Sequence, residues 1–133
     1  MKKFVIAMSI FTILAFSVKN VSASDVLIYT TPEAYNGHCN WYIVTESAVK
    51  TDLQCVCDVK AVHFFKDKPF GTPIIFRYRI WAYDNSSKVG CAVIHNKEMI
   101  REYRNILDPS EYDHDLLNAI YSAVQKYGKS NVS

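Results

Sequence analysis

The sequence predicts an α+β protein, in which a small antiparallel sheet carries a C-terminal helix packed on one face and disulfides staple the fold. Three observations lead to this prediction. Runs of β-branched and aromatic residues come first along the chain, and one strongly amphipathic stretch follows them. Strands segregated from a helix in this way are typical of the α+β class. Four cysteines in a small chain with an export signal favour covalent cross-links.

The N-terminus has the organisation of a secretory signal peptide. Met1-Lys2-Lys3 is basic, an apolar run extends from Phe4 to about Val18, and Val21-Ser22-Ala23 offers the small residues that a signal peptidase reads. A retained membrane anchor is the alternative, but the apolar run is shorter than the ~20 residues that span a bilayer. We therefore expect export to the periplasm or the extracellular space, in a bacterium, with the membrane a partner only transiently through the signal peptide.

Cleavage after residue 23 would leave one small exported domain, residues 24–133. Residues 1–23 carry three lysines and no acid, so their removal changes the formal net charge from +2 to −1. A nearly neutral chain gives no electrostatic reason to expect nucleic acid as a partner. The chain has four glycines and no G-x-S-x-G, H-E-x-x-H or P-loop motif, so no cofactor is predicted.

An even number of cysteines in an exported chain predicts two disulfides. The four are Cys39, Cys55, Cys57 and Cys91. A Cys55–Cys57 bridge is the least favoured pairing, because residues two apart on a strand hold their Cα atoms near the upper limit for a disulfide. Each of these two is therefore expected to bond to one of the others. A thiolate metal site with His38 or His95 is the alternative, although the paired C-x-x-C spacing of zinc modules is missing.

Five runs rich in β-branched and aromatic residues predict strands. They cover Val26–Thr30, Trp41–Thr45, Leu53–Phe65 (as one bent strand or two short ones), Pro73–Asp84 and Val89–Ile94. Between them, Thr31-Pro32-Glu33 favours a helical turn. The prolines on either side of Phe70-Gly71-Thr72 favour a loop. The segment from Asn96 to Ile106 is predicted to be a helix, with a hairpin turning at Asn96-Lys97 as the alternative.

The clearest predicted element is the C-terminal helix. Asp108-Pro109-Ser110-Glu111 has the pattern of a capping box with proline at the first helical position, and Gly128 is a suitable stop. Apolar residues then recur at helical spacing, at Tyr112, Leu116, Ile120, Val124 and Tyr127. We expect this stripe to cover the face of the central strand that carries Ile74, Phe76, Tyr78 and Ile80.

The opposite face of that strand is the candidate binding site. Side chains alternate across a strand, so Arg77, Arg79, Trp81 and Tyr83 share one side. Arginine and aromatic residues dominate interface hot spots, and guanidinium groups also hold anionic ligands. The alternative is that the arginines pair with acids on neighbouring strands while the aromatic rings bury against a loop.

Other candidate sites have weaker support. Glu111, His114 and Asp115 share one helix face, as a metal or acid–base site would require, but acids in a first turn also complement the helix dipole. His63 and His95 are expected to be structural. The pair His38-Cys39 would suit a thiol nucleophile only if the cysteine were free.

Together these features predict a small exported binding protein, such as an inhibitor, an immunity-type protein or an accessory factor. Its expected partner is another protein or an envelope ligand. Two alternatives are a small periplasmic hydrolase or metal-dependent enzyme using a histidine such as His114, and a structural subunit of an envelope assembly.

Overall fold

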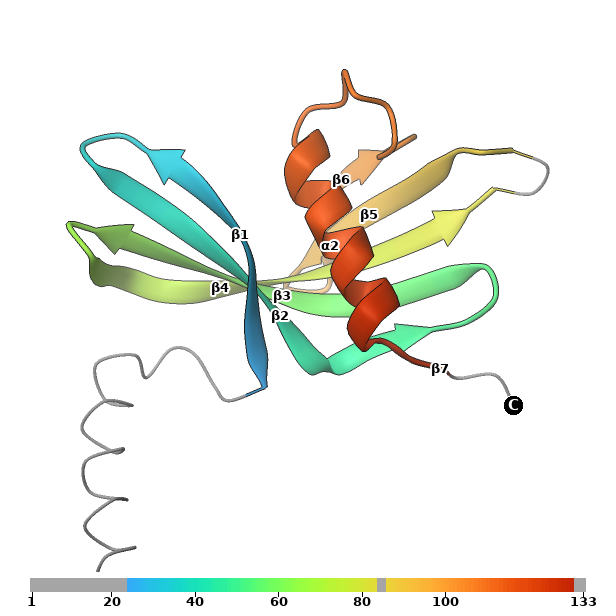
Figure 1. The fold of residues 1–133 in the computed structure, drawn as a ribbon, viewed down its shortest axis with the longest axis horizontal. Coiled ribbons are helices and arrows are strands. Elements are labelled where there is room, and N and C mark those ends of the chain that lie inside the picture. The colour runs from blue at the N-terminus through green and yellow to red at the C-terminus, as the bar shows by residue number, and fades with distance from the viewer. Residues whose placement is uncertain (1–23, 84–85, 131–133) are drawn as a thin grey trace, which may run out of the picture.

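The computed structural model describes residues 24–83 and 86–130, and an antiparallel meander dominates it (Figure 1). Six strands pair in chain order, β1-β2-β3-β4-β5-β6, and a short seventh strand pairs parallel with β2. The elements are β1 (Asp25–Glu33), β2 (Gly37–Lys50), β3 (Gln54–Phe65), β4 (Lys68–Ala82), β5 (Val89–His95), β6 (Glu98–Tyr103), the helix α2 (His114–Tyr127) and β7 (Lys129–Ser130).

The predicted fold class is wrong. Strands make up 62% of the structure and helix only 13%, so the fold is mostly antiparallel sheet with one short C-terminal helix, and not the small, disulfide-stapled α+β domain that was predicted. Strands β2, β3 and β4 have 14, 12 and 15 residues, against a usual length of about 5–6. They are this long because the segments expected to interrupt them continue them instead.

Prolines do not end these strands, because they lie where a ladder hydrogen bond is not needed. Pro32 is in β1, an edge strand, so Thr31-Pro32-Glu33 extends the strand and forms no helical turn. Strand β5 pairs with β4 only from Arg77 onwards, so the first half of β4 is also an edge. There Phe70-Gly71-Thr72 is strand and not loop, with Gly71 at φ 78° where the pairing with β3 shifts register.

The segment after β5 forms a strand, so the helix predicted from Asn96 to Ile106 is wrong and the hairpin alternative is confirmed. Asn96 and Lys97 have φ of 51° and 68°, and two residues of positive φ are what a type I′ hairpin turn requires. The following strand β6 pairs antiparallel with β5.

Helix α2 is confirmed, but it begins at His114, later than the predicted capping box. Its N-cap is Asp113, which has positive φ and makes no side-chain cap. Asp108 instead closes a turn, since its Oδ1 accepts hydrogen bonds from the Ser110 backbone N–H at 3.0 Å and from Ser110 Oγ at 2.8 Å. These bonds lower the pKa of Asp108. The helix ends before Gly128, as predicted, with the Gly128 N–H donating to the Val124 carbonyl.

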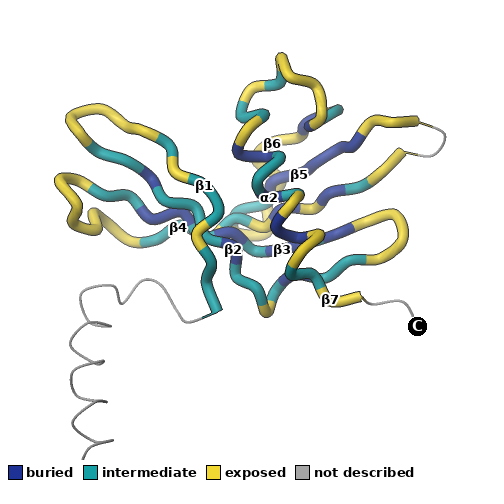
Figure 2. The backbone as a smooth tube through the Cα atoms, viewed as in Figure 1, coloured by how far each residue is buried: buried dark blue, intermediate teal, exposed yellow. Residues whose placement is uncertain are grey.

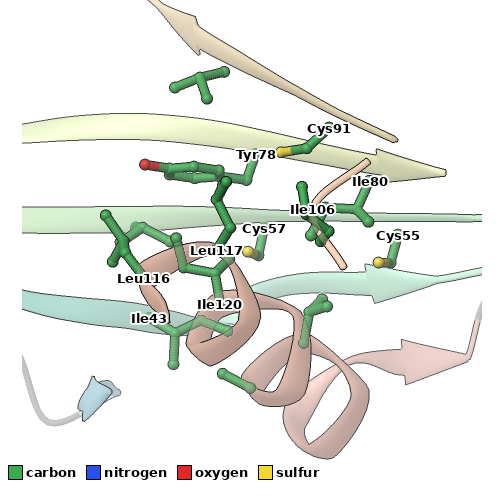
Figure 3. Close-up of a cluster of buried hydrophobic side chains, with 14 of the residues drawn as sticks. Ile43, Cys55, Cys57, Tyr78, Ile80, Cys91, Ile106, Leu116, Leu117 and Ile120 are labelled. Carbon is green, nitrogen blue, oxygen red and sulfur yellow. The ribbon is translucent and has the colours of Figure 1, made fainter. Parts of the chain in front are cut away.

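The core lies between the helix and one face of the sheet, called here the inner face (Figure 3). The helix contributes Leu116, Leu117, Ile120, Ala123 and Val124. The strands contribute Ile43, Cys57, Val59, Tyr78 and Ile80, among others. Tyr78 and Ile80 are therefore buried with the helix stripe, while Ile74 and Phe76 on the same side of β4 are only half-buried.

The helix covers only part of the inner face. Beyond it, strands β1 to β4 continue as two hairpins, β1–β2 and β3–β4, which extend to the left in Figure 1. The tips of both hairpins are exposed, whereas the strands beneath the helix are mostly buried (Figure 2). This free end of the sheet brings together residues from four strands with no helix over them.

The predicted disulfides are wrong, because all four cysteines are free and buried. The strand register explains this result. Ile80 of β4 pairs with Cys55 on one side and with Cys91 on the other, so a whole strand separates these two cysteines. Two strand spacings amount to about 9.5 Å, beyond the ~7 Å between Cα atoms that a disulfide can bridge. Cys57 shares the inner face with Cys55 (Figure 3), and Cys39 lies opposite His63.

The predicted signal peptide lies in residues 1–23, outside the described residues. Within the described ranges, α2 and every other helical segment are too short or too polar to cross a bilayer.

Candidate functional site

The structure places Arg77 and Arg79 on the outer side of β4, where Arg77 is already paired. Arg77 Nε donates to Asp58 Oδ1 at 3.0 Å, and Asp58 is its cross-strand neighbour on β3. This bond and the charge of Asp58 raise the pKa of Arg77. Arg79 is exposed and lies between Val56 and Ala92 on the adjacent strands. The alternative interpretation, in which the arginines pair with acids on neighbouring strands, is therefore confirmed for Arg77.

The same outer side carries a second ion pair. Lys60 Nζ lies 2.8 Å from Asp25 Oδ2, and the Asp25 side chain is fully shielded from solvent. Together the two pairs connect β1 with β3 and β3 with β4. Pairs of opposite charge between strands stabilise a sheet. The Lys60–Asp25 and Arg77–Asp58 pairs therefore help to hold the sheet together.

Trp81 packs on Gly90 and contacts Tyr83. The rings of Trp81 and Tyr83 meet edge to face, with their centroids 6.3 Å apart. Gly90 is the cross-strand neighbour of Trp81, and a Cβ atom at Gly90 would lie 2.5 Å from the indole. Three of the four predicted residues, Arg77, Trp81 and Tyr83, thus have contacts within the protein.

The substitution Gly90→Ala is expected to lower the free energy of unfolding by about 1–3 kcal/mol, because the added methyl group displaces the Trp81 ring. Urea unfolding of Gly90→Ala in the native background and in a Trp81→Ala background measures the effect. The penalty should largely vanish when Trp81 is absent. An equal penalty in both backgrounds would show that the indole contact is not its cause.

His114 is held by the backbone and not by acids. Its Nδ1 lies 3.0 Å from the Ile106 carbonyl, which also accepts a hydrogen bond from Asn118 Nδ2 at 2.7 Å. These bonds fasten the segment after β6 to the helix. Across residues 24–83 and 86–130, His, Cys, Asp and Glu side chains form no group of three suited to a metal ion. Glu111 and Asp115 lie near His114 in sequence but make no such group with it.

Burial makes the thiols poor nucleophiles. It raises the pKa of Cys39 to about 11, with the Glu33 charge adding to the effect. It likewise raises the pKa of Cys55 to about 11, that of Cys91 to about 12, and that of Cys57 as well. Thiolate is the reactive form of cysteine, so the free Cys39 beside His38 is not activated for catalysis. His38 instead stacks on Phe64, with ring centroids 4.9 Å apart.

An open apolar cleft lies at the free end of the sheet, between the tips of the two hairpins. We call it the tip cleft. Its volume is about 710 Å³, within the range of about 300–1,000 Å³ that is usual for ligand pockets. Its main lining residues are Tyr35, Phe64, Phe65 and Phe70, together with Glu33 and His63. Tyr35, Phe70 and Phe65 are 86%, 69% and 44% exposed, so the cleft is edged by aromatic rings that face solvent.

The strand register brings these residues together. Phe65 pairs with Gly37, and His63 pairs with Phe70. Cross-strand partners share a face, and so do residues two apart on one strand. His63, Phe65 and Phe70 therefore share a face, which continues the inner face past the end of the helix. Gly37 has no side chain to fill the space beside Phe65.

The polar part of the tip cleft is a contact between a histidine and a carboxylate. His63 Nδ1 lies 2.8 Å from Glu33 Oε1, and both side chains are a little over one-third exposed. At the rim, Lys66 Nζ lies 5.4 Å from the centroid of the Phe65 ring, a cation–π contact. His95 has no part here, since its Nδ1 lies 3.2 Å from the Ile75 carbonyl.

The sequence interpretation missed the tip cleft, although one signal for it was present. Tyr35, Phe65 and Phe70 are large aromatic residues that lie next to turn-forming residues in the sequence. A turn does not require an aromatic side chain at these positions. Turn segments are usually polar. Exposed aromatic rings on or next to two separate turns therefore indicate a binding surface. In comparisons with protein-family models, curated proteins and solved structures, nothing matches this chain.

Proposed function

We propose that this protein is a small exported binding protein whose recognition site is the tip cleft. The observation that carries the proposal is the set of exposed aromatic rings around an apolar cleft of about 710 Å³. Singly exposed apolar residues are common, but a contiguous group of them around a cleft is typical of an interaction site. The aromatic residues come from two hairpins, so the cleft depends on the folded sheet and not on one flexible loop.

Binding suits the described residues better than catalysis does. The four thiols are buried and protonated, and His114 is held by a backbone carbonyl. The tip cleft offers apolar contact and one histidine–carboxylate pair. Its volume is within the range of sites for drug-sized molecules, and its open side suits a small amphipathic ligand of the cell envelope or its surroundings that stays partly in contact with solvent.

Replacement of Phe70 by alanine is expected to weaken the binding of an apolar probe by about tenfold, since an exposed ring at a binding site contributes on the order of 1.4 kcal/mol. The neutral dye N-phenyl-1-naphthylamine is a suitable probe, because its fluorescence rises in apolar surroundings. Phe70 is 69% exposed, so its loss should not disturb the fold.

Met99→Ala is the matched control, since Met99 is 59% exposed and lies on β6, away from the tip cleft. Its affinity for the dye should equal that of the unchanged protein. Equal weakening by both substitutions, or no binding to the unchanged protein, would refute the proposed site.

A further inference from the structure

We propose that the ligand of the tip cleft is an amphipathic organic cation, with an apolar body and an ammonium head that Glu33 and the surrounding aromatic rings hold. This inference rests on the proposed function and adds the charge of the ligand to it. Three properties of the cleft lead to it: the sign of the charge in its lining, the kind of ring around it, and its size.

The charge in the lining favours a cation. Glu33 and His63 are the titratable acid and base among the described residues that line the cleft, and no lysine or arginine is among them. His63 contacts Glu33 through Nδ1, so any positive charge on the imidazole is already balanced by that carboxylate. An anionic ligand would meet Glu33 inside the cleft and would find a lysine only at the rim, where the Lys66 ammonium already lies over the Phe65 ring. A cationic ligand would share the carboxylate with the imidazole.

The rings favour a cation as well. The face of an aromatic ring attracts an ammonium group within about 6 Å of its centroid, and clusters of such rings bind quaternary ammonium groups in many proteins. In this structure the ammonium of Lys66 already lies 5.4 Å from the centroid of Phe65. Tyr35 and Phe70 present further exposed rings beside Glu33. The protein thus shows one ring–ammonium contact at the rim of the same cleft.

The contact with His63 positions the Glu33 carboxylate. Glu33 is the last residue of β1, and His63 lies on β3, with β2 between them. Their contact uses Oε1 of Glu33, and a carboxylate has a second oxygen that can accept from a ligand. Because both side chains are about one-third exposed, a head group can reach them from solvent without a change of fold.

The size of the cleft requires more than a head group. A single ammonium or trimethylammonium group fills only a small part of about 710 Å³. The remaining space is lined by Tyr35, Phe65 and Phe70, which favour an apolar body. The ligand class is therefore an apolar or aromatic compound with one cationic end.

The test uses three probes that share a phenylpropyl group and differ at the other end: phenylpropyl-trimethylammonium, phenylpropanol and phenylbutyrate. Isothermal titration calorimetry of the purified protein should rank the ammonium probe about tenfold tighter than the alcohol, with the carboxylate weakest. Glu33→Gln should reduce the advantage of the ammonium probe over the alcohol from about tenfold to less than about twofold.

Two further variants complete the test. Glu98→Gln removes an exposed carboxylate on β6 and should leave the affinities for all three probes unchanged. Phe70→Leu keeps an apolar side chain but loses the ring face, so it should weaken the ammonium probe more than the alcohol.

The outcomes separate this inference from the proposed function. Equal affinities for the ammonium probe and the alcohol, or an unchanged preference in Glu33→Gln, would overturn the inference while the cleft remained an apolar binding site. Failure of all three probes to bind would refute both.

Discussion

Raising the pH from 9 to 11 is expected to unfold the protein, because four buried thiols resist ionisation in the folded state. An unfolded chain releases these protons near the ordinary thiol pKa of 9.0, whereas the folded protein holds them to about 11 at Cys39 and Cys55 and to about 12 at Cys91. Burial raises the pKa of Cys57 also. The unfolded state therefore loses protons first, and stability falls as the pH rises above 9.

The size of this effect is large for a small domain. Each thiol contributes a loss of about 1.4 kcal/mol per pH unit between its unfolded and folded pKa values. Four thiols together give about 5 kcal/mol per pH unit near pH 10–11, against a total stability that is typically about 5–15 kcal/mol. Burial also raises the pKa of Tyr78 and Tyr103, which adds to the loss above pH 10.

Urea unfolding under reducing conditions at pH 7, 9, 10 and 11 measures the fall. Cys55→Ala is the informative variant, because it removes one of four thiols and should reduce the steepness of the fall between pH 9 and 10 by about a quarter, whatever its stability at pH 7. Stability that stays constant up to pH 11 would contradict the burial of the thiols.

The substitution Ile120→Ala is expected to cost about 2–5 kcal/mol of unfolding free energy. Ile120 is fully buried in the middle of the helix stripe and faces the inner face of the sheet (Figure 3). The helix has only 14 residues, and a helix of that length is marginal in water without tertiary packing. Removing this side chain leaves a cavity at the contact that holds the helix on the sheet.

Ser122→Ala is the control for Ile120→Ala, since Ser122 is exposed on the same helix. It should change stability by less than about 0.5 kcal/mol. Urea unfolding monitored by circular dichroism compares the two. A loss below about 1 kcal/mol for Ile120→Ala would mean that the helix contributes little to the core.

The parts of the fold that depend on local patterns could be predicted from the sequence. The alternation along β4 correctly placed Tyr78 and Ile80 on the buried side and Arg77 and Arg79 on the exposed side. The amphipathic stripe correctly located α2. Its first residue was wrong because the Asp108 side chain closes a turn of its own, which competes with helix capping.

The errors came from contacts between distant parts of the chain. Prolines interrupt central strands but are tolerated at edges, and the sequence does not show that the first half of β4 is an edge. The disulfide prediction followed from the expected compartment, and whether two cysteines can meet depends on register. Here β4 separates Cys55 from Cys91.

The tip cleft was missed for the same reason. Tyr35 and Phe70 are 35 positions apart in the sequence, and only the pairing of four strands brings their hairpins together. The predicted site, in contrast, lies on one strand, where local alternation is enough to group residues. A prediction from local sequence patterns therefore favoured the outer face of β4, where Arg77 is already paired with Asp58, and missed the tip cleft.

The most direct test of the proposed site is the amide NMR spectrum of the protein, recorded with and without phenylpropyl-trimethylammonium. Binding in the tip cleft predicts shifts at Gly37, Gly71 and Thr72, with unchanged signals from Arg79 and Ala92 on the outer side of the sheet. Shifts confined to Arg79, Ala92 and their neighbours, with the cleft signals unchanged, would contradict it and favour the outer face of β4 instead.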